Sequence, residues 1–495
     1  MMAGVDSNFA GRLWERLGEN SHLIDAATGH TIESEELRRR IPAWGAALLS
    51  TGLRKGDRVL IGCSLSPAST LVYLGAIYAG LIAVPVEERA LSGSAAALVN
   101  ATGAKAIWSE ARLTRDPEAG SASYLQGDLA GAEDGVLPPA VCSASELAAL
   151  MATSGSTGAP RFVMVSHGNL IANTEAIIRS QQLGQAERAM MILPVNYCFG
   201  ASVLHSHLYE GGGVVFDRRF MFPDKVLRSV AEFECTTFAG VPTVFNVLLG
   251  RSNIRQLALP SLKRFLQAGG GLAPEKVNAM RSTFPHAKFY VMYGQTEATA
   301  RIACMEPERW DDKPGSVGRV LDNLTVSIVD DQENEVPRGQ VGELLVKGPS
   351  ICSGYWNDRE ETQHIFRDGW LRTGDLARQD EDGYLWIVGR RGAFLKMRGT
   401  RVSLAEVEGR VAAIPGVFEC GACAVAHPEA GEALLLLVVP DREKSIEKQE
   451  ISRKLPAHWT LDSIRLVSEL PKTANGKLAR AQLSEWARNG HAGIG

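Results

Sequence analysis

The chain has 495 residues and a mass of 53.3 kDa, which is too large for one ordinary hydrophobic core and predicts two or more domains. Hydrophobic residues make up 45% of the sequence and charged residues 22%, a composition typical of soluble globular proteins. The net charge of −4 and the pI near 6.3 exclude a basic surface of the kind that binds nucleic acid.

Residues 59–86 are the segment most similar to a membrane span. Ser64, Ser66, Pro67 and Ser69 interrupt its apolar run, which divides more naturally into a strand over 59–63, a helix over 67–79 and a strand over 81–84. Proline suits the first turn of that helix, and glycine at position 80 suits its end. The N-terminal residues contain no apolar segment of signal-peptide length. We therefore expect a cytoplasmic protein without a membrane segment.

Short apolar runs alternate with longer helix-like stretches through the first 300 residues, which predicts mainly parallel α/β layers. The clearest predicted strands there are 190–194, 213–216, 236–240, 264–267 and 289–292. Residues 112–145 show no clear period and predict a surface excursion. After Pro314 the runs become short strands with turn signals (325–329, 342–346 and 384–388), which predicts a small β-rich subdomain.

A compact αβ pattern follows Arg390. It comprises a helix over 404–411, strands over 420–426 and 434–439, and a last helix from about residue 479. The pair Cys420-x-x-Cys423 lies in an apolar, strand-like run and lacks the further cysteines or histidines of a metal site. Buried, reduced thiols are the better interpretation.

Serine, threonine and glycine gather in one segment after the apolar residues 147–151. Five of the seven residues from Ser154 to Pro160 are of these three types. Small residues allow a tight turn and leave N–H and O–H donors uncovered, which suits a polyphosphate. The chain contains no G-K-[ST] sequence, so this is not a Walker P-loop. Taken alone, such a segment is more often an ordinary surface loop.

Four further motifs follow in order: YGQTE at 293–297, TGD at 373–375, GR at 389–390 and PKTANGK at 471–477. With the Ser/Thr/Gly loop they resemble the adenylate-forming superfamily, which comprises acyl-CoA synthetases, adenylation domains and beetle luciferases. Each motif alone is weak, but five in this order are specific. The resemblance extends over nearly the whole chain.

The resemblance implies an α/β multidomain fold. We expect a large N-terminal domain over 1–390, made of two α/β layered subdomains and a small β-rich subdomain, that binds ATP and an acid. A small, mobile αβ domain over 391–495 would carry Lys477. In this family a carboxylate attacks the α-phosphate of ATP to give an acyl-adenylate and pyrophosphate, and usually a thiol then displaces AMP.

The first half-reaction brings an anion up to a polyanion, so the site must supply donors, positive charge and a metal ion. The resemblance places the β- and γ-phosphates on the loop, at Thr153, Ser154, Gly155, Ser156, Thr157, Gly158 and Arg161. Arg161 replaces the usual lysine; it keeps the charge but has a planar shape. Phe162 replaces the glycine that is usual in the family after the loop.

The YGQTE and TGD motifs carry the nucleotide and metal roles. Glu297 is the expected Mg²⁺ ligand, Thr296 would face the α-phosphate, and Tyr293 and Gly294 would lie against the adenine. Asp375 would accept from the ribose hydroxyls with support from Arg390. The glycines Gly269, Gly270 and Gly271 would let the backbone approach the purine. In isolation, Glu297 could be a surface residue, and Asp375 or the glycines could be turn residues.

The resemblance assigns the two half-reactions to different loops of the C-terminal domain. Lys477 would bridge the substrate carboxylate and the α-phosphate in the transition state. A second loop with Lys396, Arg398 and Gly399 would serve the thiol step. The expected hinge is Arg391–Gly392, where glycine replaces the charged residue that is usual in the family. A solvated surface position is the alternative for Lys477.

The acid pocket is expected around residues 196–203, 267–271 and 292–294, with Tyr197, Phe199, Gly200 and Val203 as candidates. Amino-acid-activating relatives usually carry an aspartate at the position of Gly200. Without it the ammonium of an α-amino acid would be buried unpaired, so the sequence favours an apolar or aromatic acid. The nearby histidines His205 and His207 could bind a metal, but core positions are the better interpretation.

The leading hypothesis is an ATP- and Mg²⁺-dependent acid–thiol ligase that uses coenzyme A. The alternatives are loading of the phosphopantetheine of an external carrier protein, amide formation, and a non-catalytic nucleotide-binding relative. Nothing identifies a luciferin, and the lack of a G-x-S-x-G sequence excludes a typical serine hydrolase. The sequence leaves the choice between monomer and homodimer open and gives no sign of a nucleic-acid or membrane partner.

Overall fold

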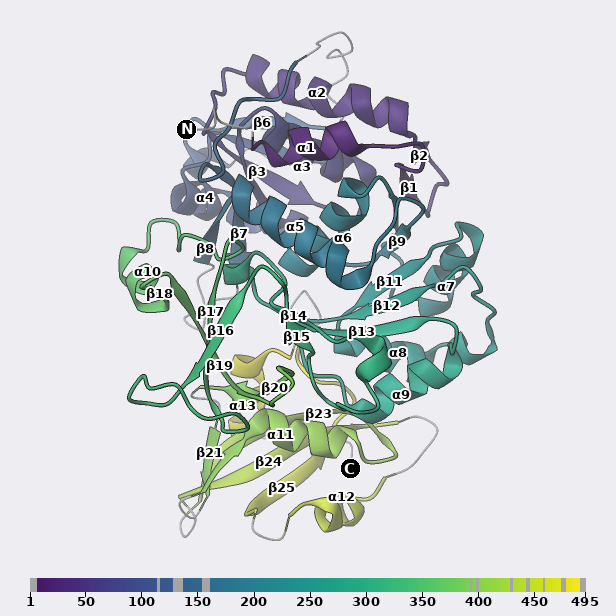
Figure 1. Ribbon diagram of the computed structural model, residues 1–495, viewed down its shortest axis with the longest axis vertical. Coiled ribbons are helices and arrows are strands. Elements are labelled where there is room, and N and C mark those ends of the chain that lie inside the picture. The colour runs from purple at the N-terminus through teal and green to yellow at the C-terminus, as the bar shows by residue number, and fades with distance from the viewer. Residues whose placement is uncertain are drawn as a thin grey trace.

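The computed structural model describes residues 7–113, 116–127, 137–153, 161–391, 394–397, 400–427, 431–441, 446–456, 459–472 and 478–489. Within these residues, no helix is both long and apolar enough to span a bilayer. The described residues form four sheets with their helices, with the N-terminal part above and the C-terminal part below in Figure 1. The predicted class, an α/β multidomain protein with a large N-terminal and a small C-terminal part, is confirmed.

A nine-stranded sheet forms the centre of the N-terminal part, in the order β15-β14-β13-β12-β11-β9-β10-β1-β2. Its strands are β1 (Leu23–Asp25), β2 (Thr31–Ile32), β9 (Arg188–Met191), β10 (Gly213–Phe216), β11 (Thr237–Gly240), β12 (Arg264–Gln267), β13 (Lys288–Tyr293), β14 (Ala303–Cys304) and β15 (Arg319–Val320). The strands from β1 to β13 along this order are parallel, so β9, β11, β12 and β13 end at one edge of the sheet. All the strands expected in this region are present; β9 begins and ends a few residues before its predicted bounds.

A six-stranded sheet, in the order β6-β5-β3-β4-β7-β8, forms the second layer. Its strands are β3 (Arg58–Cys63), β4 (Ile82–Glu87), β5 (Ala106–Ser109), β6 (Ser123–Gln126), β7 (Leu147–Thr153) and β8 (Arg161–Ser166). Within residues 112–145, which were expected to form a surface excursion, β6 pairs with β5 at the edge of the sheet. The four residues of β6 (SYLQ) include only two that are apolar or aromatic, which is too short a pattern to predict a strand.

Helices cover both sheets. They are α1 (Phe9–Arg16), α2 (Ser34–Ser50), α3 (Pro67–Tyr78), α4 (Glu88–Thr102), α5 (His167–Gln181), α6 (Cys198–Tyr209), α7 (Pro223–Glu232), α8 (Pro242–Arg251) and α9 (Pro274–Thr283). Helix α5 contacts β8 of the six-stranded sheet, and α6 contacts β9 and β10 of the nine-stranded sheet, so this pair lies between the two layers (Figure 1).

Helix α3 shows how the local sequence sets an element. Ser66 caps its N-terminus by accepting a hydrogen bond from the Ser69 amide, and Pro67 occupies the first turn. Gly80 follows its end with a φ of 73°, a conformation that costs glycine little. The strand–helix–strand interpretation of residues 59–86 is therefore confirmed.

Two smaller sheets follow. One contains β16 (Thr325–Val329), β17 (Gly342–Lys347), β18 (Phe366–Arg367), β19 (Trp370–Gln379) and β20 (Leu385–Arg390), with α10 (Arg359–Ile365) beside it. The other contains β21 (Phe394–Met397), β22 (Thr400–Ser403), β23 (Val417–His427), β24 (Gly431–Pro440) and β25 (Leu461–Leu466), with α11 (Leu404–Ala412), α12 (Lys448–Lys454) and α13 (Arg480–Asn489). The domain boundary predicted at 390/391 falls in the short connection between β20 and β21.

Three buried histidines make the core sensitive to acid. Burial lowers the pKa of His205 to about 3 and that of His207 to about 4, and burial with the nearby Arg188 lowers the pKa of His22 to about 4. In the unfolded chain these groups titrate near their ordinary value of 6.5. Below that pH the unfolded chain binds protons that the folded chain does not, so acid favours unfolding.

We predict that the free energy of unfolding falls between pH 6.5 and 5 by up to ~1.4 kcal/mol per pH unit for each of these histidines. The variant His205→Gln removes one of these histidines, so the slope of the free energy of unfolding against pH should fall by about a third. Urea unfolding at several pH values measures it. The matched control is His30→Gln, on an exposed turn. An unchanged slope in His205→Gln would contradict the assignment.

Candidate active site

The carboxylate of Asp375 joins three of the sequence motifs. Tyr293, at the end of β13, donates its Oη proton to Asp375 Oδ2 over 2.6 Å. Arg390, the last residue of β20, donates from Nε to Asp375 Oδ1 over 3.1 Å. Asp375 is buried, and its amide donates to Thr373 Oγ1 over 3.1 Å. The YGQTE, TGD and GR motifs therefore meet at one carboxylate.

Electrostatics keep these partners in their hydrogen-bonding states. Burial, followed by the charge of Asp375, raises the pKa of Tyr293 well above its ordinary value. The same carboxylate is the main cause of the raised pKa of Arg390. The phenol therefore remains a donor and the guanidinium a cation at physiological pH.

Glu297 lies in the short helix η3 (Thr296–Ala298), and its position is fixed by a residue that sequence reasoning missed. Tyr355 donates from Oη to Glu297 Oε1 over 2.9 Å, and burial and that charge together raise the pKa of Tyr355. A single carboxylate with one anchored oxygen fits Mg²⁺, which takes most of its ligands from phosphates and water. Among the described residues, no group of three or more possible metal ligands occurs.

The strands that flank the Ser/Thr/Gly loop pair with each other, with Thr153 opposite Arg161. Residues 154–160, which include Ser154, Gly155, Ser156, Thr157 and Gly158, lie outside the described part of the chain. Phe162 is 3% exposed and packs into the core of the six-stranded sheet, so this replacement of glycine anchors the strand after the loop.

Arg161 is engaged by α10 and the turn before it. Its Nη1 lies 2.8 Å from Glu361 Oε1, its Nε lies 3.6 Å from Asp358 Oδ2, and its guanidinium faces the ring of Tyr355 at 5.7 Å. Tyr355 therefore contacts both Glu297 and Arg161. The predicted phosphate ligand and the predicted metal ligand share this neighbour, although their roles stay predictions.

Glycine is required at position 294. A Cβ there would lie 1.7 Å from the carbonyl oxygen of Ala300, so the chain after the YGQTE motif passes directly over this residue. At the end of β12, Gly269 has a φ of 85°, and a Cβ on Gly271 would meet no atom within 4 Å. Gln267 donates to the Gly270 carbonyl over 2.8 Å and holds this turn. At Gly271 the backbone therefore has open space on its side-chain side.

The segment expected to line the acid pocket forms the start of α6. Tyr197 is half-buried, and Phe199 and Val203 are buried. A Cβ at Gly200 would lie 2.4 Å from the Pro194 carbonyl oxygen and 2.7 Å from that of Leu193, so this position has no room for any side chain. The absence of an aspartate here is therefore a consequence of close backbone packing.

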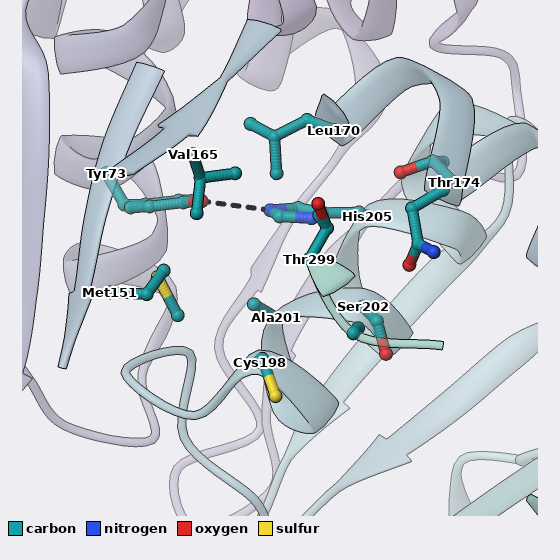
Figure 2. Close-up of a pocket in the computed structure, with 12 residues that line it drawn as sticks. Tyr73, Met151, Val165, Leu170, Thr174, Cys198, Ala201, Ser202, His205 and Thr299 are labelled. Atoms are coloured by element: carbon teal, nitrogen blue, oxygen red, sulfur yellow. Dashed lines mark hydrogen bonds between the residues drawn. The ribbon is translucent and has the colours of Figure 1, made fainter. Parts of the chain in front are cut away.

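A small pocket lies beside this segment, between α3, α5 and α6 (Figure 2). Tyr73 and His205 point toward each other across it, and their Oη and Nε2 atoms share a hydrogen bond of 3.1 Å. The other histidine, His207, bonds through Nδ1 to the Val203 carbonyl over 2.9 Å. Both histidines are thus neutral core residues with protein partners, which supports the core interpretation over a metal site.

The C-terminal candidates are only partly described. The backbone of Lys396 lies on β21, while Gly392, Arg398, Gly399 and Lys477 lie outside the described residues. Arg391 donates from Nη1 to Glu343 Oε2 over 2.6 Å, and its amide donates to the Gly374 carbonyl over 2.7 Å. The chain is thus fixed to the β-rich subdomain up to Arg391. The hinge itself stays a prediction.

Comparison with known proteins identifies the family to which these motifs belong. The model of the AMP-binding enzyme family matches residues 14–356, and that of its C-terminal domain matches residues 406–477. A feruloyl-CoA synthase from Amycolatopsis sp is 30% identical over 472 residues, covering 92% of this chain and 94% of the relative. A 4-coumarate–CoA ligase from Vanilla planifolia is 27% identical over 500 residues, covering 93% and 89%.

Solved structures agree with this result. The ATP-bound MatB from Rhodopseudomonas palustris superposes with a TM-score of 0.88 at 27% identity, covering 99% of this chain and 100% of that one. The fold and the motifs are thus those of an adenylate-forming enzyme. The chain belongs to the AMP-binding enzyme family, and the prediction of an AMP-forming acid–thiol ligase is confirmed at the level of enzyme class.

We predict that Asp375→Asn weakens ATP binding by about 10- to 100-fold, because hydrogen bonds to a charged acceptor contribute about 1.5–3 kcal/mol. Calorimetric titration with ATP measures the affinity. The matched control is Asp380→Asn, in the turn between β19 and β20, where the carboxylate pairs with Lys313 at 2.7 Å. Equal affinities for the two variants would contradict the nucleotide role of Asp375.

Proposed function

We propose that this enzyme activates a carboxylic acid without an α-ammonium group as its acyl-adenylate and transfers the acyl group to coenzyme A. The observation that carries the proposal is the convergence of Tyr293, Asp375 and Arg390 at one edge of the nine-stranded sheet. These residues come from three distant motifs, and together they form a nucleoside-binding arrangement of aromatic ring, carboxylate and cation. The relatives named as CoA synthases and ligases support coenzyme A as the acceptor.

Each residue has a distinct task in this proposal. Asp375, oriented by Tyr293 and Arg390, accepts hydrogen bonds from the ribose hydroxyls. Thr296 faces the α-phosphate. Mg²⁺ held at Glu297 would neutralise phosphate charge. Lys477 offsets the repulsion between the incoming carboxylate and the α-phosphate in the transition state. The loop with Lys396, Arg398 and Gly399 then serves the thiol, which attacks the acyl carbon and displaces AMP.

The packing at Gly200 supports the exclusion of amino acids. An α-amino acid needs a carboxylate beside its ammonium, because burial of an unpaired cation is costly. Position 200 cannot supply one, since the carbonyls of Leu193 and Pro194 occupy the space of a side chain. Tyr197 and Phe199 instead offer ring surfaces to an apolar or aromatic acid body.

Release of pyrophosphate from ATP and Mg²⁺ in the presence of an acid library tests the adenylation step. Each α-amino acid is paired with its deaminated analogue, for example phenylalanine with 3-phenylpropionate. We expect the analogue to be preferred by roughly a thousandfold, as several kcal/mol of unpaired charge requires. Preference for the amino acid in every pair would refute the proposed substrate class. If no acid causes release of pyrophosphate, the result would support a non-catalytic relative.

We predict that Lys477→Ala lowers the rate of adenylate formation by ~10²–10³ while ATP binding is retained. The lysine charge is needed where carboxylate meets phosphate, so the transition state loses more than the ground state. Transfer of the acyl group from a pre-made acyl-adenylate to coenzyme A should survive in the same variant. Lys472→Ala is the matched control, because that lysine pairs with Glu419 at 2.8 Å. An adenylation rate equal to the parent's would contradict the assignment.

The same transfer assay, supplied with either coenzyme A or a phosphopantetheinylated carrier protein, decides between the two acceptors. Product formation with coenzyme A alone is the expected result. Exclusive transfer to the carrier, or to an amine, would show that adenylation is correct but the acceptor is not.

A further inference from the structure

Arg301 is a buried cation with no counter-charge among the described residues. Its side chain is 2% exposed, and its Nη1 atom has no hydrogen-bond partner. Among the residues the structure describes, no carboxylate pairs with its guanidinium. The titratable groups that act on it are the thiols of Cys304 and Cys198, and burial raises the pKa of Cys304 to about 11, so that thiol stays neutral at physiological pH. Burial of an unpaired charge is among the costliest arrangements in a protein, so this residue requires an explanation.

The backbone at Arg301 is held firmly in place. The Asn173 side chain accepts from the Arg301 amide over 3.2 Å and donates to its carbonyl over 2.9 Å. Two residues earlier, Thr299 has a φ of 67°, which is rare for a β-branched residue, and its hydroxyl donates to the Ser350 carbonyl over 2.6 Å. Strain of this kind is retained where the surrounding structure over-determines it, often at ligand sites.

The guanidinium lies beside Phe199, one of the residues expected to line the acid pocket. Its Cζ is 5.1 Å from the centre of the Phe199 ring, a cation–π contact that offsets only part of the burial cost. Burial lowers the pKa of Arg301 to about 10, so the side chain is still a cation at neutral pH. Asn173, Cys198 and Ala300, which adjoin it, line the pocket of Figure 2.

Other buried polar atoms at the same edge of the sheet also lack partners. They are Asn196 Oδ1 in the loop after β9, Gln267 Oε1 at the end of β12, and Gln295 Nε2 after β13. Asn196 and Gln267 belong to segments expected to form the acid pocket, and Gln295 directly follows the third such segment, 292–294. Unsatisfied polar atoms are rare in folded proteins, and a ligand bound at this edge would supply the missing partners of these three.

We infer that Arg301 is a specificity-determining residue that binds a second carboxylate at the far end of the acid substrate. The inference rests on the proposed function and refines it: the substrate is a dicarboxylic acid whose apolar or aromatic body lies against Phe199. One carboxylate reacts with ATP. The other forms a charge-assisted hydrogen bond with the guanidinium, whose planar fork matches a carboxylate.

Matched acid pairs test this inference in the pyrophosphate-release assay. The pairs are benzoate with terephthalate, 3-phenylpropionate with its 4-carboxy derivative, and hexanoate with adipate. We expect the diacid to have the higher kcat/KM, by about a hundredfold or more, in every pair that the enzyme uses, because leaving the cation unpaired is costly. Preference for the monoacid in every such pair would overturn the inference while leaving the proposed function intact. If no acid releases pyrophosphate, the proposed function fails and this inference fails with it.

Arg301→Met separates a binding role from a structural one. It should reverse the preference between diacid and monoacid, with a melting temperature equal to or above that of the parent, because it removes an unpaired buried charge. Arg301→Lys keeps the charge and should retain part of the diacid preference. The control is Arg281→Met, whose arginine pairs with Asp311 at 2.6 Å on the surface. A lower melting temperature with an unchanged preference would show a structural role and overturn the inference. If neither Arg301 variant folds, the preference of the parent enzyme for the diacid or the monoacid in the matched pairs decides whether the inference stands.

Discussion

The geometry of the site depends on the carboxylate of Asp375. Tyr293, at the end of β13 in the nine-stranded sheet, and Arg390, at the end of β20, both donate to it. Because Asp375 is buried and its amide is bonded to Thr373, the carboxylate has little freedom to move. A fixed acceptor of this kind loses little entropy when a nucleotide binds, which favours affinity through pre-organisation. At the site, the large sheet and the β-rich subdomain thus meet at one side chain.

Much of the fold could be predicted from the sequence, because long apolar runs and turn residues are local signals. The strand–helix–strand unit at 59–86 and the four strands that end at the site are examples. Strand β6 was missed because four residues at a sheet edge carry too weak a pattern. The motif order also indicated the family, since five weak signals with a fixed order are jointly specific.

The partners of the site residues could not be predicted in the same way. Tyr355 is 58 residues from Glu297, and Glu361 is 200 residues from Arg161, and nothing local in the sequence links either pair. Arg301 did leave a signal, because it is the one charged residue in the apolar run from Ala298 to Met305. Its importance becomes clear only from its burial and the absence of a counter-charge among the described residues. Interpretation of a charge in an apolar run therefore needs the packing around it.

The tight packing at Gly200 limits how this pocket could evolve. The carbonyl oxygens of Leu193 and Pro194 would lie within 2.7 Å of the first atom of any new side chain. Conversion into an amino-acid-activating enzyme therefore cannot begin with a single substitution at this position. The loop after β9 would first have to retreat, and that loop continues directly into Asn196 and Tyr197. The two changes must occur together, so an aspartate at position 200 is opposed by a steric barrier in the backbone.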